Sequence, residues 1–555
     1  MFPTMTHSRF NFLALAVGIL STILLLWLWV QDRASLRPSH ATRIARTAEA
    51  TSATSLPASA RKPDAVSDPV TRALLATLQR LLSRSDTRAR ESVLTFKDDE
   101  AYRRFLARAK KAGLTVLGQL DGLRTARVRF DSFSSLQGDL LDNTADYSAV
   151  SANYLMNIPG PPAKDARAAV NPVPFGNRTL EFLGATGDRS QWGAGVTIAV
   201  LDTGIAPDPT FGSGRLRTLD LGLGTTPGAG SEDGHGTAVA ALAAGLAPDA
   251  PGVAPAANLL SIRVTDATGT SDIFTVAQGI VAAVDAGAKI VNISLGGYAT
   301  NSALDAAIAY AGTRGAVIVA AAGNDQAAQL AWPAADARVI SVGAVDAAEQ
   351  QVSFSNSGPQ LQITAPGYGV QTAWLDGQRA TIDGTSVSSP IVAGAIAAVM
   401  SQNPSLTPQQ AWQVLQQTAS DGGAPGADPD FGHGILNLGW AMNRADLTHV
   451  DTAVSSHYYD AANNQMEFVV QNRSAQQVTG LTLNVDVSGT ASANLIPTLG
   501  PGEIYVVKLP VSSATLAASG TLKFTTQLVN PPGLVDRVPA NNRRSSTLTA
   551  PAPAK

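Results

Sequence analysis

The chain has 555 residues, of which 45% are hydrophobic and 15% charged, so it can hold two to four domains with a large core. Its formal net charge of −3 gives no electrostatic footprint for a polyanion, and we therefore expect no nucleic-acid binding. The absence of cysteine excludes disulfides, thiolate metal sites and a cysteine nucleophile.

An uncharged apolar segment, residues 10–30, is long enough to span a bilayer, which takes ~20 residues. We interpret residues 1–33 as a signal or membrane-anchor segment, and an uncleaved anchor is favoured because no small-x-small cleavage site follows directly. The arginines after this segment argue for retention inside the cell. Export is still preferred, because large domains translocate largely regardless of charge.

Residues 34–68 are rich in Ala, Ser, Thr, Pro and Arg and predict a disordered stalk. Residues 69–158 predict a leucine-striped helix at 70–84 and then a small α+β, ferredoxin-like domain of the split βαβ type. Its expected order is strand, helix, two short strands, helix and a last strand near 148–158. A proline-punctuated linker, residues 159–175, follows.

Residues 176–445 alternate continuous apolar strands with helices. This pattern predicts a three-layer α/β/α domain whose mostly parallel sheet is covered on both faces. Residues 446–549 change to alternating stretches without a helical period, which predicts an all-β sandwich. Residues 550–555 are expected to be an unstructured tail.

The stretch IDGTSVSSPIVAGAIAAVM, residues 382–400, places Ser386 at the start of an almost wholly apolar helix. The first N–H groups of a helix lack intrahelical partners, so they would stabilise an oxyanion beside Ser386. Pro390 is expected within the first turn, where it removes an N–H that had no partner. Taken alone, the stretch fits an ordinary N-capped core helix better than a catalytic one.

A serine nucleophile needs a base within hydrogen-bond reach, itself oriented by a third group. Four of the six histidines lie outside the expected catalytic fold: His7, His40, His449 and His457. Of the other two, His433 suits a surface loop, and His235, at a helix start, is the better base. Asp233, two positions before His235, is assigned to capping the helix.

Three stretches resemble the active-site signatures of the subtilisin-like serine proteases: VTIAVLDTGI (196–205), EDGHGTAVAALAAG (232–245) and GTSVSSPIVAG (384–394). The order Asp202, His235, Ser386 is also the subtilisin order, and it differs from the orders of chymotrypsin and of the α/β-hydrolases. A fourth stretch, VIVAAAGND (317–325), resembles the oxyanion segment of the family. The resemblance covers roughly residues 170 to 445.

The resemblance implies a serine endopeptidase that acts on polypeptides through an acyl-enzyme. It implies these roles: catalytic Asp202, His235 and Ser386; oxyanion donor Asn324; substrate-binding Ser294, Leu295, Gly296 and Asp325. We expect no cofactor. Calcium is left open without identifiable sites, because the stretch after His235 is shorter than in calcium-dependent relatives and lacks their Asn-rich loop.

Two positions depart from the family signatures. Ala238 replaces the histidine three residues after the catalytic one, and Val387-Ser388 replaces the usual Met-Ala after the serine. Neither change removes a catalytic atom.

The flanking regions also carry resemblances. Residues 69–158 resemble the inhibitory prodomain that precedes many subtilisin-like enzymes, although a generic small domain is the alternative. The zymogen layout predicts self-cleavage between about Ile158 and Asn177, in the KDARAAV segment or after Phe175. Residues 446–549 resemble bacterial adhesion-related immunoglobulin-like modules. We expect a monomer that is exported, either anchored through residues 10–30 or released after processing.

The same sequence features allow three other interpretations. The sequence LDTG at 201–204 also spells the aspartic-protease signature, but that mechanism needs a second such aspartate and none occurs. An α/β-hydrolase would need a G-x-S-x-G elbow, which GTSVS is not. The non-enzyme alternative is an adhesion or scaffold protein carrying an inactive protease fold.

Overall fold

The computed structural model describes residues 69–160, 172–225 and 233–550, all of which belong to one compact unit, Ala50–Lys555. The expected membrane segment, the stalk, most of the linker and most of the tail lie outside these ranges. None of the helices in the described ranges combines the length and the apolar character that a bilayer crossing needs.

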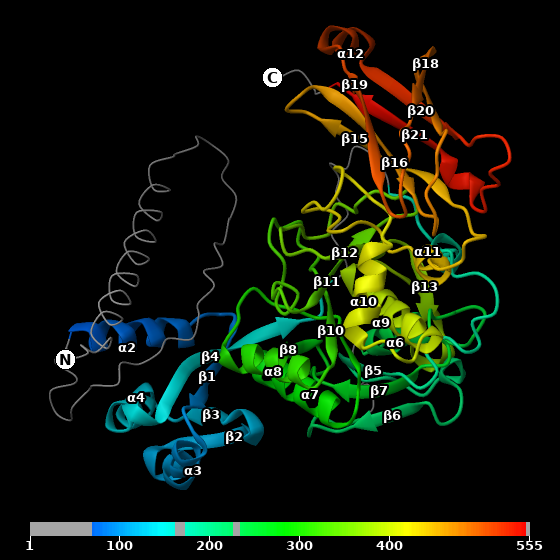
Figure 1. Ribbon diagram of the computed structural model, residues 1–555. Coiled ribbons are helices and arrows are strands. Elements are labelled where there is room, and N and C mark those ends of the chain that lie inside the picture. Colours follow the sequence, from blue (N-terminus) through cyan, green and yellow to red (C-terminus); the bar gives the residue numbers. More distant parts are fainter. Residues whose placement is uncertain (1–68, 161–171, 226–232, 551–555) are drawn as a thin grey trace, which may run out of the picture. The chain divides into compact units, whose positions relative to one another are not determined.

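A seven-stranded sheet forms the centre of the domain that holds the expected catalytic residues (Figure 1). Its order is β12-β11-β10-β9-β5-β7-β6, and every pairing between neighbours is parallel. The strands are β5 Thr197–Asp202, β6 Leu216–Leu219, β7 Asn258–Arg263, β9 Ile290–Ile293, β10 Val317–Ala321, β11 Ile340–Val345 and β12 Ile363–Pro366. The expected parallel α/β domain is confirmed. Its short edge strands β6 and β12 are additions that the sequence pattern does not predict.

Helices cover both faces of this sheet. Ile198 and Val200 of β5 pack into one apolar cluster with α6 and α9, whereas Ala199 and Leu201 pack into another with α7 and α8. Successive strand residues point to opposite faces, so a strand covered on both sides is apolar throughout. The helices are α6 His235–Ala244, α7 Ile273–Asp285, α8 Ser302–Thr313, α9 Thr385–Gln402, α10 Pro408–Gln417 and α11 Leu438–Asn443, with a short α5 at Thr179–Phe182. A hairpin of β13 Val370–Ala373 and β14 Arg379–Ile382 leads into α9.

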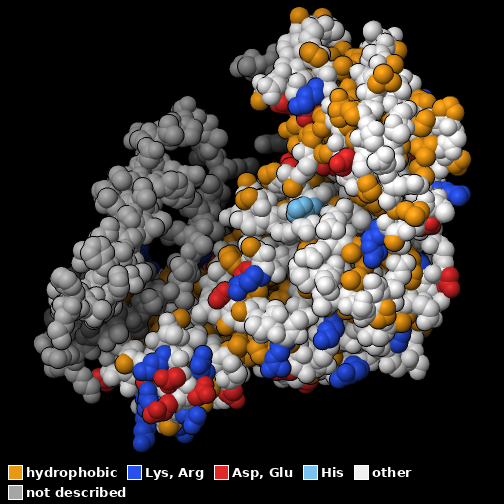
Figure 2. Space-filling model, viewed as in Figure 1, with side chains coloured by type: hydrophobic (Ala, Val, Ile, Leu, Met, Phe, Trp, Pro, Cys, Tyr) orange, Lys and Arg blue, Asp and Glu red, His pale blue; other side chains and the backbone are white. Residues whose placement is uncertain are grey.

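The N-terminal described domain is a small antiparallel sheet with helices, in the order β2-β3-β1-β4. Its elements are α2 Pro69–Leu82, β1 Thr87–Phe96, α3 Asp99–Arg108, β2 Leu114–Leu120, β3 Thr125–Phe130, α4 Phe133–Asp142 and β4 Tyr147–Asn157. Phe96 packs its ring against Tyr102, Phe105 and Tyr147 in the core. Figure 2 shows Lys, Arg, Asp and Glu side chains crowded on the outer surface of this domain. β4 also pairs with β8, Thr270–Asp272, which follows β7 in the chain.

The C-terminal described region consists of two antiparallel sheets that share one apolar core. One sheet has the order β15-β16-β19 and the other β18-β17-β20-β21. The strands are β15 Thr452–Asp460, β16 Gln465–Asn472, β17 Thr482–Val487, β18 Thr490–Leu495, β19 Ile504–Pro510, β20 Thr521–Val529 and β21 Arg543–Thr549. A seven-residue helix, α12 Ser513–Ser519, departs from the all-β expectation. The Ser512 side chain caps this helix, a short local signal in a region otherwise dominated by strand alternation.

Candidate active site

Asp202 and His235 are in contact at the carboxyl ends of the parallel strands. Asp202 is the last residue of β5 and is fully buried, and its Oδ1 also accepts a hydrogen bond from the Thr203 N–H at 2.8 Å. His235 is the first residue of α6, and its Nδ1 lies 2.9 Å from Asp202 Oδ1 and 3.0 Å from Oδ2. Because a carboxylate only accepts, Nδ1 carries the proton and Nε2 is the basic nitrogen. This arrangement can serve as an oriented general base.

The turn after β5 fixes the start of α6. Thr203 Oγ1 donates to Asp233 O and accepts from Gly236 N–H, both at 3.0 Å. A Cβ on Gly236 would lie 2.3 Å from Gly204 O, so only glycine allows this close approach. His235 is thereby held beside Asp202 through the backbone on both sides.

Ser386 is the second residue of α9 and is only 4% exposed. Pro390 lies inside α9, beyond the first turn, so the expected placement of this proline was wrong. A proline there offers no N–H to the Ser386 carbonyl four residues earlier. The Ser294 hydroxyl donates to that carbonyl instead, at 3.0 Å, and so ties the helix start to the segment after β9.

Asn324 follows β10 and meets the start of α9. Its Oδ1 accepts from the N–H and the hydroxyl of Thr385, each at 2.9 Å. Its Nδ2 is buried and has no hydrogen-bond partner among the described residues. A Cβ on Gly384, whose φ is +139°, would lie 2.8 Å from Asn324 Nδ2 and 3.0 Å from Ser386 Oγ. The unsatisfied donor and the serine oxygen therefore border one small space that glycine leaves empty.

The predicted substrate edge, Ser294 to Gly296, is already paired. Gly296 N–H donates to Asn157 O at 2.9 Å, and Asn157 N–H donates to Gly296 O at 2.8 Å, in an antiparallel bridge. On the other side, Ile158 N–H donates to Gly269 O at 3.0 Å. The end of β4 thus lies as an added strand between two segments of the catalytic domain. Ser294 and Leu295 are buried, so the edge offers the backbone of Gly296.

Asp325 lies beside the oxyanion candidate and close to the same edge. It is exposed, and its Oδ2 accepts a hydrogen bond from the Tyr298 hydroxyl at 2.5 Å. Burial, together with this hydrogen bond, raises the pKa of Tyr298. Tyr298 therefore stays protonated and keeps Asp325 in place, while the role of Asp325 in specificity stays a prediction.

The assignment of Asp233 as a helix cap is corrected. Gly234 occupies the N-cap position of α6 and no side chain caps it, which leaves Asp233 one residue too early. The Asp233 carboxylate lies instead 3.7 Å from Arg263 Nη2. His433 is exposed in a loop, as expected.

Ser388, one of the two departures from the family signature, has a structural place. Its buried hydroxyl is within 3.1 Å of both Ala365 O and Pro366 O, so it fastens α9 to β12. Ala238, the other departure, is fully buried in α6.

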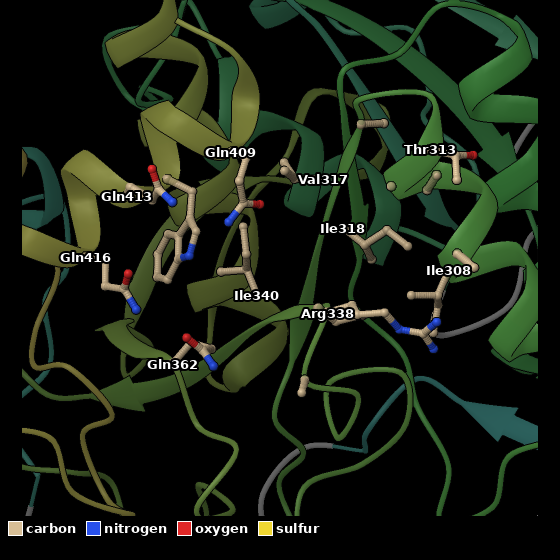
Figure 3. A pocket seen from close by; sticks show the side chains of 17 residues that line it. Ile308, Thr313, Val317, Ile318, Arg338, Ile340, Gln362, Gln409, Gln413 and Gln416 are labelled. Atoms are coloured by element: carbon tan, nitrogen blue, oxygen red, sulfur yellow. The ribbon is translucent and has the colours of Figure 1, made fainter. Parts of the chain in front are cut away.

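A cavity of about 660 Å³ lies elsewhere in the same domain (Figure 3). It is lined by α8, α10 and the first residues of β10 and β11, among them Val317, Ile340 and Trp412. Val317 begins β10, whereas Asn324 follows the end of this strand. The cavity therefore lies at the amino ends of the strands, opposite the candidate active site. Its polar lining is mainly glutamine, Gln409, Gln413 and Gln416 among others, which supplies neither nucleophile nor base.

Metal ligands do not converge in the described parts of the chain, where no group of three or more His, Cys, Asp or Glu side chains forms a metal-binding cluster. We therefore assign no calcium ligand.

Sequence reasoning missed several residues that support the site. Asn292 is fully buried in β9, donates to Ser294 Oγ at 3.0 Å and accepts from Ser389 Oγ at 2.5 Å. The available signal was a polar residue inside the apolar strand KIVNISLG, since a buried polar group must find partners. Thr385, which holds Asn324, gave no signal beyond its place in the serine motif.

Known proteins are similar to part of this chain. A family model described as the subtilase family matches residues 193–434. The thermostable alkaline protease of Halalkalibacterium halodurans is 37% identical over 256 residues, which are 46% of this chain and 69% of that protein. Subtilisin Savinase of Lederbergia lenta is 36% identical over 270 residues, which are 48% of this chain and 97% of that protein. A solved structure of a mutant of the protease domain of PatA is 29% identical, with a TM-score of 0.42, over 46% of this chain and 96% of that chain.

The parallel sheet, the Asp–His pair and the serine at a helix start fit a serine hydrolase of the subtilisin type. The identities with the alkaline protease and subtilisin extend this to the sequence level. The chain belongs to the subtilase family and is a subtilisin-like serine endopeptidase.

Proposed function

We propose that this endopeptidase cleaves peptide bonds with Ser386 as nucleophile, His235 as general base and Asp202 as the residue that orients the base. The observation that carries the proposal is the contact of His235 Nδ1 with both Asp202 oxygens, at 2.9 and 3.0 Å. His235 Nε2 takes the Ser386 proton as Oγ attacks the peptide carbonyl. It then gives that proton to the leaving amine, and an activated water releases the acyl group.

The oxyanion of each tetrahedral intermediate is assigned to Asn324 Nδ2 and the Ser386 N–H. The amide nitrogen is buried and lacks a partner among the described residues, so it is ready to donate without first breaking a bond. The Ser386 N–H lies in the first turn of α9, where backbone donors have no intrahelical acceptor. Each donor stabilises the transition state most strongly, because the negative charge on the oxygen develops there.

Covalent labelling tests the nucleophile. A serine-directed fluorophosphonate should label the wild-type protein and leave Ser386→Ala unlabelled. Ser386→Ala, His235→Ala and Asp202→Ala should each lose most peptide-amide hydrolysis without unfolding, because triad members act as a unit. Near-normal turnover by Ser386→Ala would contradict the assignment. The inactive-scaffold alternative has no support in relatives that are themselves proteases.

We propose further that residues 69–158 are an inhibitory prodomain. Support comes from the end of β4, which pairs with Gly296 at the edge expected to bind substrate. Ion pairs add to this interface, since Arg88 Nε and Arg127 Nη1 both lie 3.3 Å from Asp272 Oδ2. A peptide substrate would need the same edge, so the prodomain excludes it as long as β4 stays in place.

The strand register indicates the first self-cleavage site. Asn157, the last residue of β4, faces Gly296 in an antiparallel bridge, so Pro159, two residues beyond the strand, would face Ser294. Ser294 is bonded to the Ser386 carbonyl. We therefore propose the Pro159–Gly160 bond as the first to be cut, inside the expected window. This bond is not among those that the sequence favoured, of which the ones in the KDARAAV segment lie outside the described residues.

N-terminal sequencing tests this processing. Wild type should show a new N-terminus at Gly160, or further on if trimming follows, and Ser386→Ala should stay full length. Identical processing of both proteins would mean that another protease makes the cut. A wild-type cut that begins after Phe175, with no earlier intermediate, would refute the register argument alone.

The remaining assignments complete the proposal. We propose an exported monomer with residues 10–30 as signal or anchor, a catalytic domain at 176–445 and an immunoglobulin-like sandwich at 446–549. The two sheets around one core support the last of these.

A further inference from the structure

Residues 322–327 form the loop after β10 that carries Asn324. We propose that Asn356 is the positioning residue of the oxyanion hole, because its side chain holds this loop so that Asn324 Nδ2 faces Ser386. The inference rests on the proposed role of Asn324. Asn356 itself comes from the connection between β11 and β12 and is fully buried.

The side-chain amide of Asn356 forms hydrogen bonds with the loop on both sides of Asn324. Its Oδ1 accepts hydrogen bonds from the N–H groups of Asp325 and Ala327, both at 3.0 Å. Its Nδ2 donates to Ala322 O at 3.1 Å. One rigid planar group therefore fixes backbone atoms before and after the oxyanion residue.

The backbone of Asn356 adds a hydrogen bond to the residue directly before Asn324. Its N–H donates to Gly323 O at 3.0 Å. A Cβ on Gly323, whose φ is +109°, would lie 2.2 Å from Asn356 Nδ2. Glycine at 323 thus serves two needs, a left-handed backbone and room for the amide to lie against it.

A third link passes through Tyr298. Asn356 Nδ2 donates to the Tyr298 hydroxyl at 2.8 Å, and this hydroxyl donates to Asp325 Oδ2 at 2.5 Å. Both amide hydrogens and both acceptor positions of Asn356 are then used, which fixes the orientation of the amide. A buried network that is fully satisfied in this way is rigid.

The network acts on catalysis through geometry. Thr385 holds Oδ1 of the Asn324 side chain, and Asn356 holds the loop that carries the Asn324 backbone. Together they set the position of Nδ2. Misplacement by about 1 Å can cost ~10²-fold in rate. Asn356→Ala should therefore lower kcat by ~10–100-fold. KM should stay within about twofold, since substrate pairs with Gly296 in the ground state.

A double-mutant cycle with enzyme that is expressed as the full chain and left to process itself tests the inference. Asn324→Ala, Asn356→Ala and the double variant are compared on one peptide amide, with active sites counted by the fluorophosphonate end point. The loss of one oxyanion asparagine in subtilisin costs ~10²–10³-fold, which sets the scale for Asn324→Ala. If Asn356 acts through Asn324, Asn356→Ala should cost less than about twofold in the Asn324→Ala background.

Two further variants keep the outcome decisive. Asn356→Asp keeps an oxygen for the Asp325 and Ala327 N–H groups and stands in if the alanine variant does not fold. Ser341→Ala is the control, because Ser341 is equally buried and its hydroxyl donates to Gln360 O at 2.6 Å, outside the loop. It should lower the thermal midpoint and leave kcat unchanged.

Three results would overturn the inference. They are full additivity of the two substitutions, a rise in KM at constant kcat, or a loss of stability alone like that of Ser341→Ala. Failure of the proposed function looks different, because wild type would then show no Ser386-dependent hydrolysis at all.

Discussion

Asp325 is the charged side chain directly after the oxyanion candidate, and it lies at the rim of the substrate edge. It is exposed and hydrogen-bonded to Tyr298, so it keeps a defined position but remains well solvated. An exposed charge of this kind contributes under ~1 kcal/mol to any one ion pair. Its effect on specificity should therefore be small and visible only by comparison among substrates.

We expect Asp325→Asn to reduce the preference for Lys or Arg over Glu before the scissile bond by a few-fold. The amide oxygen can still accept a hydrogen bond from Tyr298, so the rim of the substrate edge keeps its shape while losing one charge. The measurement is kcat/KM on a peptide series that differs only at that position. Asp305→Asn, at an exposed aspartate on α8, serves as the control. Profiles that do not differ across charged residues would remove this role.

The loop after α10 is the element with the most unusual electrostatics. Asp421 is 5% exposed, and its Oδ1 accepts from Gly426 N–H at 2.8 Å. Its Oδ2 has no hydrogen-bond partner within the described ranges. Burial, reinforced by the nearby Asp428 carboxylate, raises the pKa of Asp421 to about 7. The folded protein thus holds this proton more tightly than the unfolded chain does.

This shift makes stability fall as pH rises. The contribution of Asp421 is complete below its unfolded pKa of ~3.9 and is lost as pH passes through about 7. Asp421→Asn abolishes the ionisation and retains an acceptor for Gly426. The variant should gain on the order of 2–4 kcal/mol over wild type above pH 7, and almost nothing near pH 4.

Thermal midpoints at pH 4, 6 and 8 check this prediction. Both proteins should carry Ser386→Ala, which prevents self-digestion during the scan. A lower midpoint for the asparagine variant at pH 8 would mean that the ionised carboxylate stabilises the loop.

At the scale of the whole molecule, the C-terminal module contacts the catalytic domain through a few polar groups. Gln471 Oε1 accepts from Asp421 N–H at 3.3 Å, and Ser456 Oγ donates to Gly423 O at 3.1 Å. Arg544 forms an ion pair with Glu349. None of these groups belongs to the proposed triad or to the substrate edge.

Deletion of residues 446–555 should therefore leave kcat/KM on small peptides within about twofold of wild type. The thermal midpoint should fall, because the loop around Asp421 loses its partners on β15 and β16. Activity assays and thermal scans on the soluble truncated protein check both parts. A folded truncation without activity would show that the module completes the site.

Short local patterns were enough to propose the main site residues. The stretches around Asp202, His235, Ser386 and Asn324 are each 9 to 14 residues long, and the apolar runs that position them are local as well. For the same reason, the strands β5, β7, β9, β10 and β11 and the helices between them could be predicted from periodicity.

The supporting contacts could be read only from the tertiary structure. The Ser294 hydroxyl donates to the Ser386 carbonyl, to which Pro390 has no N–H to offer. Asn356 holds the loop of Asn324, and Asn157 pairs with Gly296. Each contact joins residues tens to more than a hundred positions apart, brought together by strand order and by the docking of the N-terminal domain. A pattern along the chain specifies which face of an element is apolar, but the partner of a buried polar group depends on which elements become neighbours.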